Sequence, residues 1–112
     1  MGRVFEGERA DRIDQIIKVH MEIKHIQIKI TGKVQGVSFR AVTKVVADQM
    51  GIRGMIKNEA DGSVYIEAEG DDTLLEVFTD WCNEGTDRAK IENVEITPGF
   101  VKNYQNFEII KK

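Results

Sequence analysis

The chain has 112 residues and a formal net charge of −3, with 41% hydrophobic and 31% charged residues. This length suits one domain with one core, and the composition is that of an ordinary globular protein. The negative net charge argues against an extended nucleic-acid partner, which usually binds a basic surface. Cys82 is the only cysteine, so the chain has no internal disulfide. With two histidines it offers no zinc-ligand spacing, and we expect no metal and no cofactor.

Residues 1–20 stand apart from the rest of the chain. From Glu8 to Met21, apolar side chains recur at helical intervals among charged ones: Ile13, Ile16, Ile17 and Met21. The spacing indicates a short amphipathic helix that would be marginal by itself. Three readings stay open: a disordered tail, a helix packed on the domain, and a helix for self-association. We expect residues 21–112 to form the domain, as a monomer unless the extension associates.

Targeting signals are missing from the sequence. No apolar run approaches the roughly 18 residues of a membrane-spanning helix. Residues 1–11 also lack the apolar block of a secretion signal. We therefore expect a cytoplasmic protein with no membrane partner.

The first predicted elements are a strand and a helix. Ile26, Ile28 and Ile30 alternate with polar residues, which predicts a strand over 25–31 with one buried and one wet face. From 37 to 50 the apolar residues fall at helical spacing, at positions 39, 42, 46 and 50. The predicted helix ends before Gly51, a typical C-terminal signal.

A hairpin follows the first helix. Residues 52–58 and 63–69 are predicted strands, and the Asp-Gly pair within 59–62 is typical of the turn between them. Period-two alternation predicts that Val64, Ile66 and Ala68 point into the core. The alternate residues, Tyr65, Glu67 and Glu69, are expected to point outward.

The remaining segments complete the fold prediction. A second helix is predicted over 72–84, with caps among residues 70–73. Its expected buried stripe is Leu74, Leu75, Phe78, Trp81 and Cys82. A strand over 90–97, a turn at Pro98-Gly99 and a short strand over 107–110 follow. The order β-α-β-β-α-β, with the last strand divided by a loop, predicts a ferredoxin-like α+β sandwich, with an antiparallel sheet and two helices on one face.

The loop between the first strand and the first helix is the main candidate site. It reads Gly32-Lys33-Val34-Gln35-Gly36-Val37-Ser38-Phe39-Arg40. Glycines can take positive φ and expose backbone N–H groups, and a helix N-terminus favours negative charge. Arg40 is a cation where the helix dipole prefers an acid, which suits a bound anion. Neither GxxxxGK[ST] nor GxGxxG is present, so the residues alone leave open an anion site or a plain loop.

Asn58 is the second candidate. It ends the predicted 52–58 strand on the same side as the inward residues at 52, 54 and 56. Its amide can donate and accept hydrogen bonds, which suits holding a water molecule. By itself, a turn residue before Glu-Ala-Asp-Gly is the stronger reading.

Three segments resemble the acylphosphatase family, in its free-standing small form. Residues 32–40 are similar to its signature G-x-V-Q-G-V-x-F-R. Residues 54–64 resemble its second pattern, N-x-x-x-G-x-V after a basic residue, but Met55 replaces the usual aromatic and Ile56 a smaller residue. Residues 85–94 resemble G-P-x-x-A-x-V-x-x-V, with Thr86 where proline is common. The resemblance covers about residues 22–111.

The resemblance implies metal-independent hydrolysis of the carboxyl–phosphate bond of a small-molecule acyl phosphate. It assigns catalysis to Arg40, which binds the phosphate, and to Asn58, which positions the attacking water. It assigns phosphate binding to the loop residues Gln35, Gly36, Val37, Ser38, Phe39 and Arg40. A guanidinium and a ring of N–H donors suit phosphoryl transfer, which needs positioning and charge stabilisation.

Two alternatives compete with an enzyme. A module of this fold could bind an acyl or carbamoyl phosphate without hydrolysing it. The same topology also serves RNA recognition, which needs exposed aromatics on the sheet. The third predicted strand offers only Tyr65 between acids, so an RNA partner is not expected.

Overall fold

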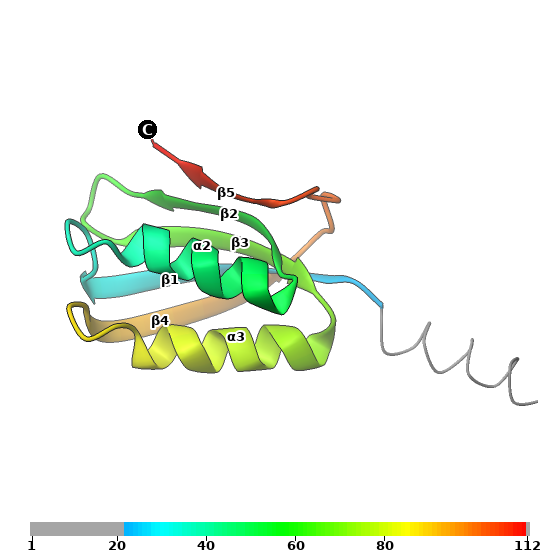
Figure 1. Ribbon diagram of the computed structural model, residues 1–112, viewed down its shortest axis with the longest axis horizontal. Helices are drawn as coiled ribbons and strands as arrows, with labels where there is room; N and C mark the ends of the chain where they lie inside the picture. Colours follow the sequence, from blue (N-terminus) through cyan, green and yellow to red (C-terminus); the bar gives the residue numbers. More distant parts are fainter. Residues whose placement is uncertain (1–21, 112) are drawn as a thin grey trace, which may run out of the picture.

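The computed structural model describes residues 22–111 (Figure 1). The predicted extension over residues 1–20, with its amphipathic helix, lies outside the described residues. The elements, labelled as in Figure 1, are β1 (Lys24–Lys33), α2 (Phe39–Met50), β2 (Arg53–Asn58), β3 (Val64–Gly70), α3 (Asp72–Glu84), β4 (Lys90–Gly99) and β5 (Phe107–Ile110). Neither helix within 22–111 is long and apolar enough to cross a bilayer.

The strands form one sheet in the order β4-β1-β3-β2-β5, and α2 and α3 cover the same face of it (Figure 1). The ferredoxin-like fold is therefore confirmed. One pairing differs from the predicted antiparallel sheet, because β5 runs parallel to β2. The chain leaves β4 at one edge, crosses the sheet through residues 100–106 and adds β5 at the opposite edge. The last two predicted strands are thus far apart in the sheet.

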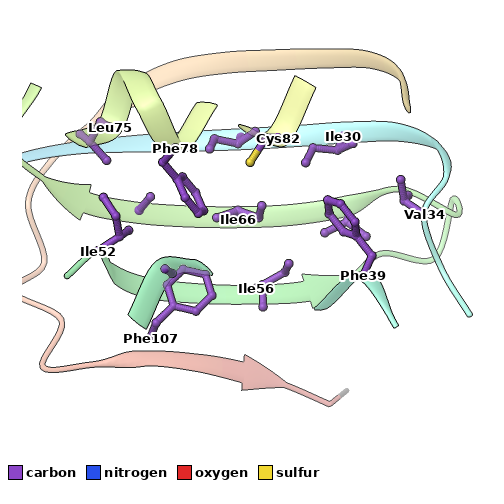
Figure 2. Close-up of a cluster of buried hydrophobic side chains, with 14 of the residues drawn as sticks. Ile30, Val34, Phe39, Ile52, Ile56, Ile66, Leu75, Phe78, Cys82 and Phe107 are labelled. Carbon is purple, nitrogen blue, oxygen red and sulfur yellow. The ribbon is translucent and has the colours of Figure 1, made fainter. Parts of the chain in front are cut away.

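A single apolar core lies between the sheet and the helices (Figure 2). Its largest fully buried apolar side chains are Phe39, Phe78, Phe107, Ile28, Ile30, Ile52, Ile56 and Ile66. The predicted stripe of α3 is confirmed, with Leu75, Phe78 and Cys82 buried and its other members packed against the core. The Asp71 carboxylate caps this helix by accepting a hydrogen bond from the Leu74 amide at 2.8 Å.

Three of the four predicted apolar positions of α2 lie on the core, because Phe39 is buried and Val46 and Met50 pack against it. Phe39, Thr43 and Ala47 are buried, whereas Val42 is partly exposed. The Thr43 hydroxyl donates to the Phe39 carbonyl at 2.7 Å, so this polar group has a partner inside the core. The helix also starts at Phe39 rather than at 37, because Ser38 has a left-handed backbone (φ 61°).

The far face of the sheet is not the wet surface that alternation predicted. Glu67 and Glu69 are buried, with 6% and 0% of their surface exposed, because the 100–106 crossover covers them. Glu69 accepts hydrogen bonds from the Lys102 and Tyr104 amides. His25 Nδ1 donates to the same carboxylate at 2.8 Å. These contacts fix the crossover to β1 and β3.

Glu67 completes this buried group. It accepts hydrogen bonds from the Tyr65 and Tyr104 hydroxyls and from Lys102 Nζ. Burial by itself raises the pKa of the Glu67 carboxyl, but the hydrogen bonds from Tyr104, Lys102 and Tyr65 outweigh it and lower that pKa to about 2. The pKa of Glu69 is lowered in the same way, against the effect of its burial. We call this group the carboxylate cluster: His25, Tyr65, Glu67, Glu69, Lys102 and Tyr104.

The predicted turn at Pro98-Gly99 is wrong. Both residues continue β4, where Pro98 pairs with Ile26 of β1. Proline has no N–H to donate, so it is tolerated in a strand at the edge of a sheet. Residues 90–99 form one strand as a result.

Candidate functional site

The loop between β1 and α2 is shaped by its own residues and fixed by the core. Gly36 (φ 74°) and Ser38 (φ 61°) both have a left-handed backbone, so the chain curls sharply before α2. Val34 and Val37 are buried beside this curl, and Phe39 is 1% exposed at the start of the helix. The loop is therefore held at several points, which keeps its shape fixed around the cavity that it borders.

The backbone amides of this curl have no partners within residues 22–111. The N–H groups of residues 36–41 donate to no other backbone or side-chain group there. The Ser38 side chain makes no capping hydrogen bond, and the first turn of α2 has no acidic residue. The positive end of the helix dipole is thus left without a negative group from the described chain. This arrangement suits a bound anion.

A cavity of about 450 Å³ lies at this helix end. Its lining comes from the loop, the start of α2, the end of β2 and the end of the chain's last strand: Val34, Gly36, Ser38, Phe39, Arg40, Ala41, Asn58, Ile109 and Lys111. Most of the predicted site residues meet here, including Arg40 and Asn58, which are distant in sequence. Gln35 and Val37 do not line the cavity.

Arg40 is tethered to β5. Its Nη1 donates to the Ile110 carbonyl at 3.4 Å, a long hydrogen bond. A guanidinium has five N–H groups, so most of them stay available to a ligand. The tether orients the side chain across the cavity while its charge remains free to pair with an anion.

Asn58 presents its amide at the same cavity. It is the last residue of β2 and pairs with Val64 of β3, so its backbone is fixed. Its side-chain Oδ1 is buried and has no hydrogen-bond partner among the described residues. Buried polar atoms in proteins nearly always have a partner. This amide is therefore suited to hold a water molecule or a ligand.

Gln35 connects the two halves of the site. Its Nε2 donates to the Glu59 and Ser63 carbonyls, both at 2.8 Å. These carbonyls belong to the hairpin between β2 and β3, directly after Asn58. The predicted substrate-binding side chain thus contacts the hairpin and sets the distance between the loop and Asn58.

The charges around the cavity all have one sign. Arg40 and Lys111 are the charged side chains in the lining that the described residues provide, and no carboxylate joins them. Of the other cations near the motifs, Lys57 lies over the Tyr65 ring, on the far face of the sheet. Within residues 22–111, no group of three His, Cys, Asp or Glu side chains is placed to hold a metal ion.

The positions that depart from the family patterns lie away from the cavity. Ile56 is fully buried in the core, and Met55 faces the opposite side of the sheet. The Thr86 hydroxyl accepts a hydrogen bond from the Ala89 amide in the loop after α3. None of the three lines the cavity. Ile109 and Lys111 do line it, and no motif of the sequence had indicated them.

Comparisons with known proteins bear on the family and the fold. The sequence model of the acylphosphatase family matches residues 26–109. An acylphosphatase from Lactiplantibacillus plantarum is 43% identical over 88 residues, which are 78% of this chain and 98% of the relative. The crystal structure of acylphosphatase from Bacillus subtilis superposes with a TM-score of 0.75 at 31% identity, over 78% of this chain and 98% of that one.

One larger protein contains a similar unit. Full-length HypF, in a phosphate- and nucleotide-bound form, superposes with a TM-score of 0.73 at 29% identity. The match covers 81% of this chain but 12% of HypF. The family model spans both the loop and the Asn58 strand, and the curated relative is matched over nearly its whole length. The chain therefore belongs to the acylphosphatase family.

Proposed function

We propose that this acylphosphatase cleaves its substrates in the cavity between the 34–38 loop and β5. In this proposal Arg40 and the loop amides bind the phosphoryl group, and Asn58 positions the attacking water. The products are a carboxylate and inorganic phosphate. The observation that carries the proposal is that Arg40, Asn58 and the unpartnered end of α2 border one cavity.

Phosphate binding follows from the charge around the loop. The phosphoryl group of an acyl phosphate carries negative charge that spreads over its oxygens in the transition state. The N–H groups of residues 36–41 and the Arg40 guanidinium offer fixed donors to those oxygens. Donors that are already in place stabilise this charge without reorganisation, which is usually the largest part of catalysis.

Hydrolysis needs a water molecule on the far side of phosphorus from the leaving group. The Asn58 amide is a suitable partner because its buried oxygen can accept a hydrogen bond from water. The water oxygen forms the new bond to phosphorus and its protons stay with the phosphate product, while the bridging oxygen leaves on the carboxylate with the electron pair of the broken bond. Since the leaving group is a carboxylate, a weak base, the step does not require a strong general acid. We propose that it proceeds without a metal ion.

The chain acts, in this proposal, as a cytoplasmic monomer on a small molecule, with no nucleic-acid or membrane partner. The net charge of −3 supports this assignment. The single cysteine, Cys82, supports the cytoplasmic assignment, because a chain without an internal disulfide suits a reducing compartment. Residues 1–20 could still mediate self-association.

The site can be tested with benzoyl phosphate as substrate. We expect Asn58→Ala to lower kcat by about 10²-fold, because the attacking water loses the partner that positions it. Arg40→Ala should lower kcat/KM further, because it removes the charge as well. Arg88→Ala and Asn83→Ala, which change the same residue types on the exposed surface, should keep native rates.

Three results would decide against the proposal. Activity that survives both Arg40→Ala and Asn58→Ala would place the chemistry elsewhere. A rate that is lost in excess EDTA and restored by added metal would refute the metal-free step. Saturable phosphate binding without turnover would favour a module that only binds acyl or carbamoyl phosphates.

A further inference from the structure

Lys111 lies at the cavity although neither the glycine loop nor the Asn58 segment includes it. It follows β5 directly and belongs to the same cavity lining as Arg40 and Asn58. Its side chain is exposed, so its charge is hydrated and can reach a ligand at the mouth of the cavity. The position is set by the backbone rather than by the length of a flexible tail.

The register of β5 fixes where Lys111 lies. The parallel pairing with β2 matches Ile56 with Ile109 and Lys57 with Ile110. Continued by one residue, the same register puts Lys111 level with Asn58. Side chains alternate along a strand, so Lys111 shares the face of Ile109, which also lines the cavity. Lys111 therefore borders the same cavity as the amide proposed to position water.

The phosphoryl group does not need this second cation. Arg40 and the amides of residues 36–41 already surround the helix end. The cavity of about 450 Å³ is in the size range of sites that enclose a whole small organic ligand, so it has room for the acyl part of a substrate. Val34, Ala41 and Ile109 give this space an apolar wall, and Lys111 is the remaining charged group in the lining that residues 22–111 provide.

We infer that Lys111 is a specificity-determining residue, which favours acyl phosphates that carry a carboxylate on the acyl group. The inference rests on the proposed function of the cavity. In this arrangement Arg40 binds the phosphoryl end of the substrate, and the Lys111 ammonium pairs with the second anion near the mouth. Substrates with an uncharged acyl group can contact Lys111 but form no ion pair with it.

Matched aromatic substrates test this inference. Benzoyl phosphate lacks a second anion, whereas 3- and 4-carboxybenzoyl phosphates add one at two positions. The quantity to compare is the ratio of kcat/KM for each carboxylated substrate to that for benzoyl phosphate. Electronic effects of the carboxylate on the leaving group cancel when this ratio is compared between the native protein and a variant.

We expect Lys111→Gln to lower this ratio about two- to fivefold for at least one of the two carboxylated substrates, as expected for an exposed ion pair. The change should lie in KM rather than in kcat. Lys111→Glu should lower the ratio further, by repulsion. Lys90→Gln, which removes a charge from an exposed lysine on β4, should leave the ratio unchanged. In the native protein the ratio should fall with added salt, because the Debye length shortens from about 10 Å at 0.1 M salt to about 3 Å at 1 M.

The outcomes separate this inference from the function on which it rests. If the native protein hydrolyses benzoyl phosphate but Lys111→Gln leaves both ratios unchanged, the specificity role is wrong and the site stands. If Lys111→Gln lowers all three kcat/KM values equally, Lys111 contacts the phosphoryl group and the inference also fails. If Arg40→Ala keeps the native rate, the site itself is wrong.

Discussion

Glu69 binds the 100–106 crossover, which leads into β5 beside the site. Replacing Glu69 therefore tests whether the carboxylate cluster stabilises both the fold and the site. The carboxylate is fully buried and accepts three hydrogen bonds, from His25 Nδ1 at 2.8 Å, the Tyr104 amide at 3.0 Å and the Lys102 amide. Glu69→Ala removes the acceptor from the buried His25 ring and from the two part-buried amides of Lys102 and Tyr104. Each unsatisfied donor costs about 1–3 kcal/mol, and the loss of one member of a buried charged group costs about 3–5 kcal/mol.

We therefore expect Glu69→Ala to lower the free energy of unfolding by about 3–5 kcal/mol. This is a large part of the stability of a domain of this size, which is about 5–15 kcal/mol. Each 1 kcal/mol shifts the midpoint of thermal unfolding by about 4 °C or more, so a loss of 3 kcal/mol should lower it by about 12 °C. Activity should fall as well, because the crossover that Glu69 holds leads into β5 and the carbonyl that tethers Arg40.

Urea unfolding followed by Trp81 fluorescence measures the first effect. Trp81 stacks on Phe39 at 5.8 Å between ring centroids and so reports on the core beside the site. Glu69→Gln keeps one acceptor oxygen and should lose less stability than the alanine variant. Glu92→Ala, an exposed carboxylate on β4, should stay within about 0.5 kcal/mol of the native protein. A Glu69→Ala variant equally close to native stability would refute the assigned role of the carboxylate cluster.

Two further changes test other parts of the structure. The pKa values of Glu67 and Glu69 are lowered in the folded state, that of Glu67 from 4.5 to about 2. The two carboxylates therefore stabilise the fold fully above about pH 4.5, and this stabilisation is lost as the pH falls towards 2. Urea unfolding at pH 3 and pH 7 should show this loss, and Glu67→Gln should reduce the difference; an equal pH dependence in that variant would contradict the assignment. Gln35→Ala should lower stability by about 1–2 kcal/mol and raise KM for benzoyl phosphate, because the loop loses its two hydrogen bonds to the hairpin. Gln105→Ala, an exposed control, should change neither value, and native KM in Gln35→Ala would show that the loop holds its shape without the hairpin.

Local patterns predicted the elements, and the resemblance to acylphosphatases selected the glycine loop and Asn58 as the candidate site. The glycine loop and Asn58 are both read from short stretches, where turn chemistry and strand period decide the geometry. Period two along β2 correctly indicated that Asn58 shares a side with the buried residues of that strand, which is the side of the cavity. The helix stripe of α3 was predicted for the same reason. Such features depend on neighbours only a few residues away.

The features that were not predicted depend on distant segments. Alternation along β3 places Glu67 and Glu69 on one face, but it does not say that residues 100–106 cover that face. That crossover has no regular period, so its path could not be read from its sequence. Lys111 was not predicted for a similar reason, because its position at the cavity follows from the parallel pairing of β5 with β2. Pro98 was predicted to lie in a turn because the sequence alone does not show that its strand, β4, is at the edge of the sheet, where proline is tolerated.

The loss of β5 would affect both the activity of the enzyme and its tendency to aggregate. Arg40 and Ile110, seventy positions apart, meet across this edge of the sheet. Proteolytic removal of β5 would release the arginine, delete the lysine at the mouth of the cavity and strip the outer neighbour from β2. The N–H and C=O groups of β2 would then be free to pair with strands of other copies, the first step towards aggregation. In the proposed site, one short segment thus supports both the Arg40 side chain and the paired edge of β2.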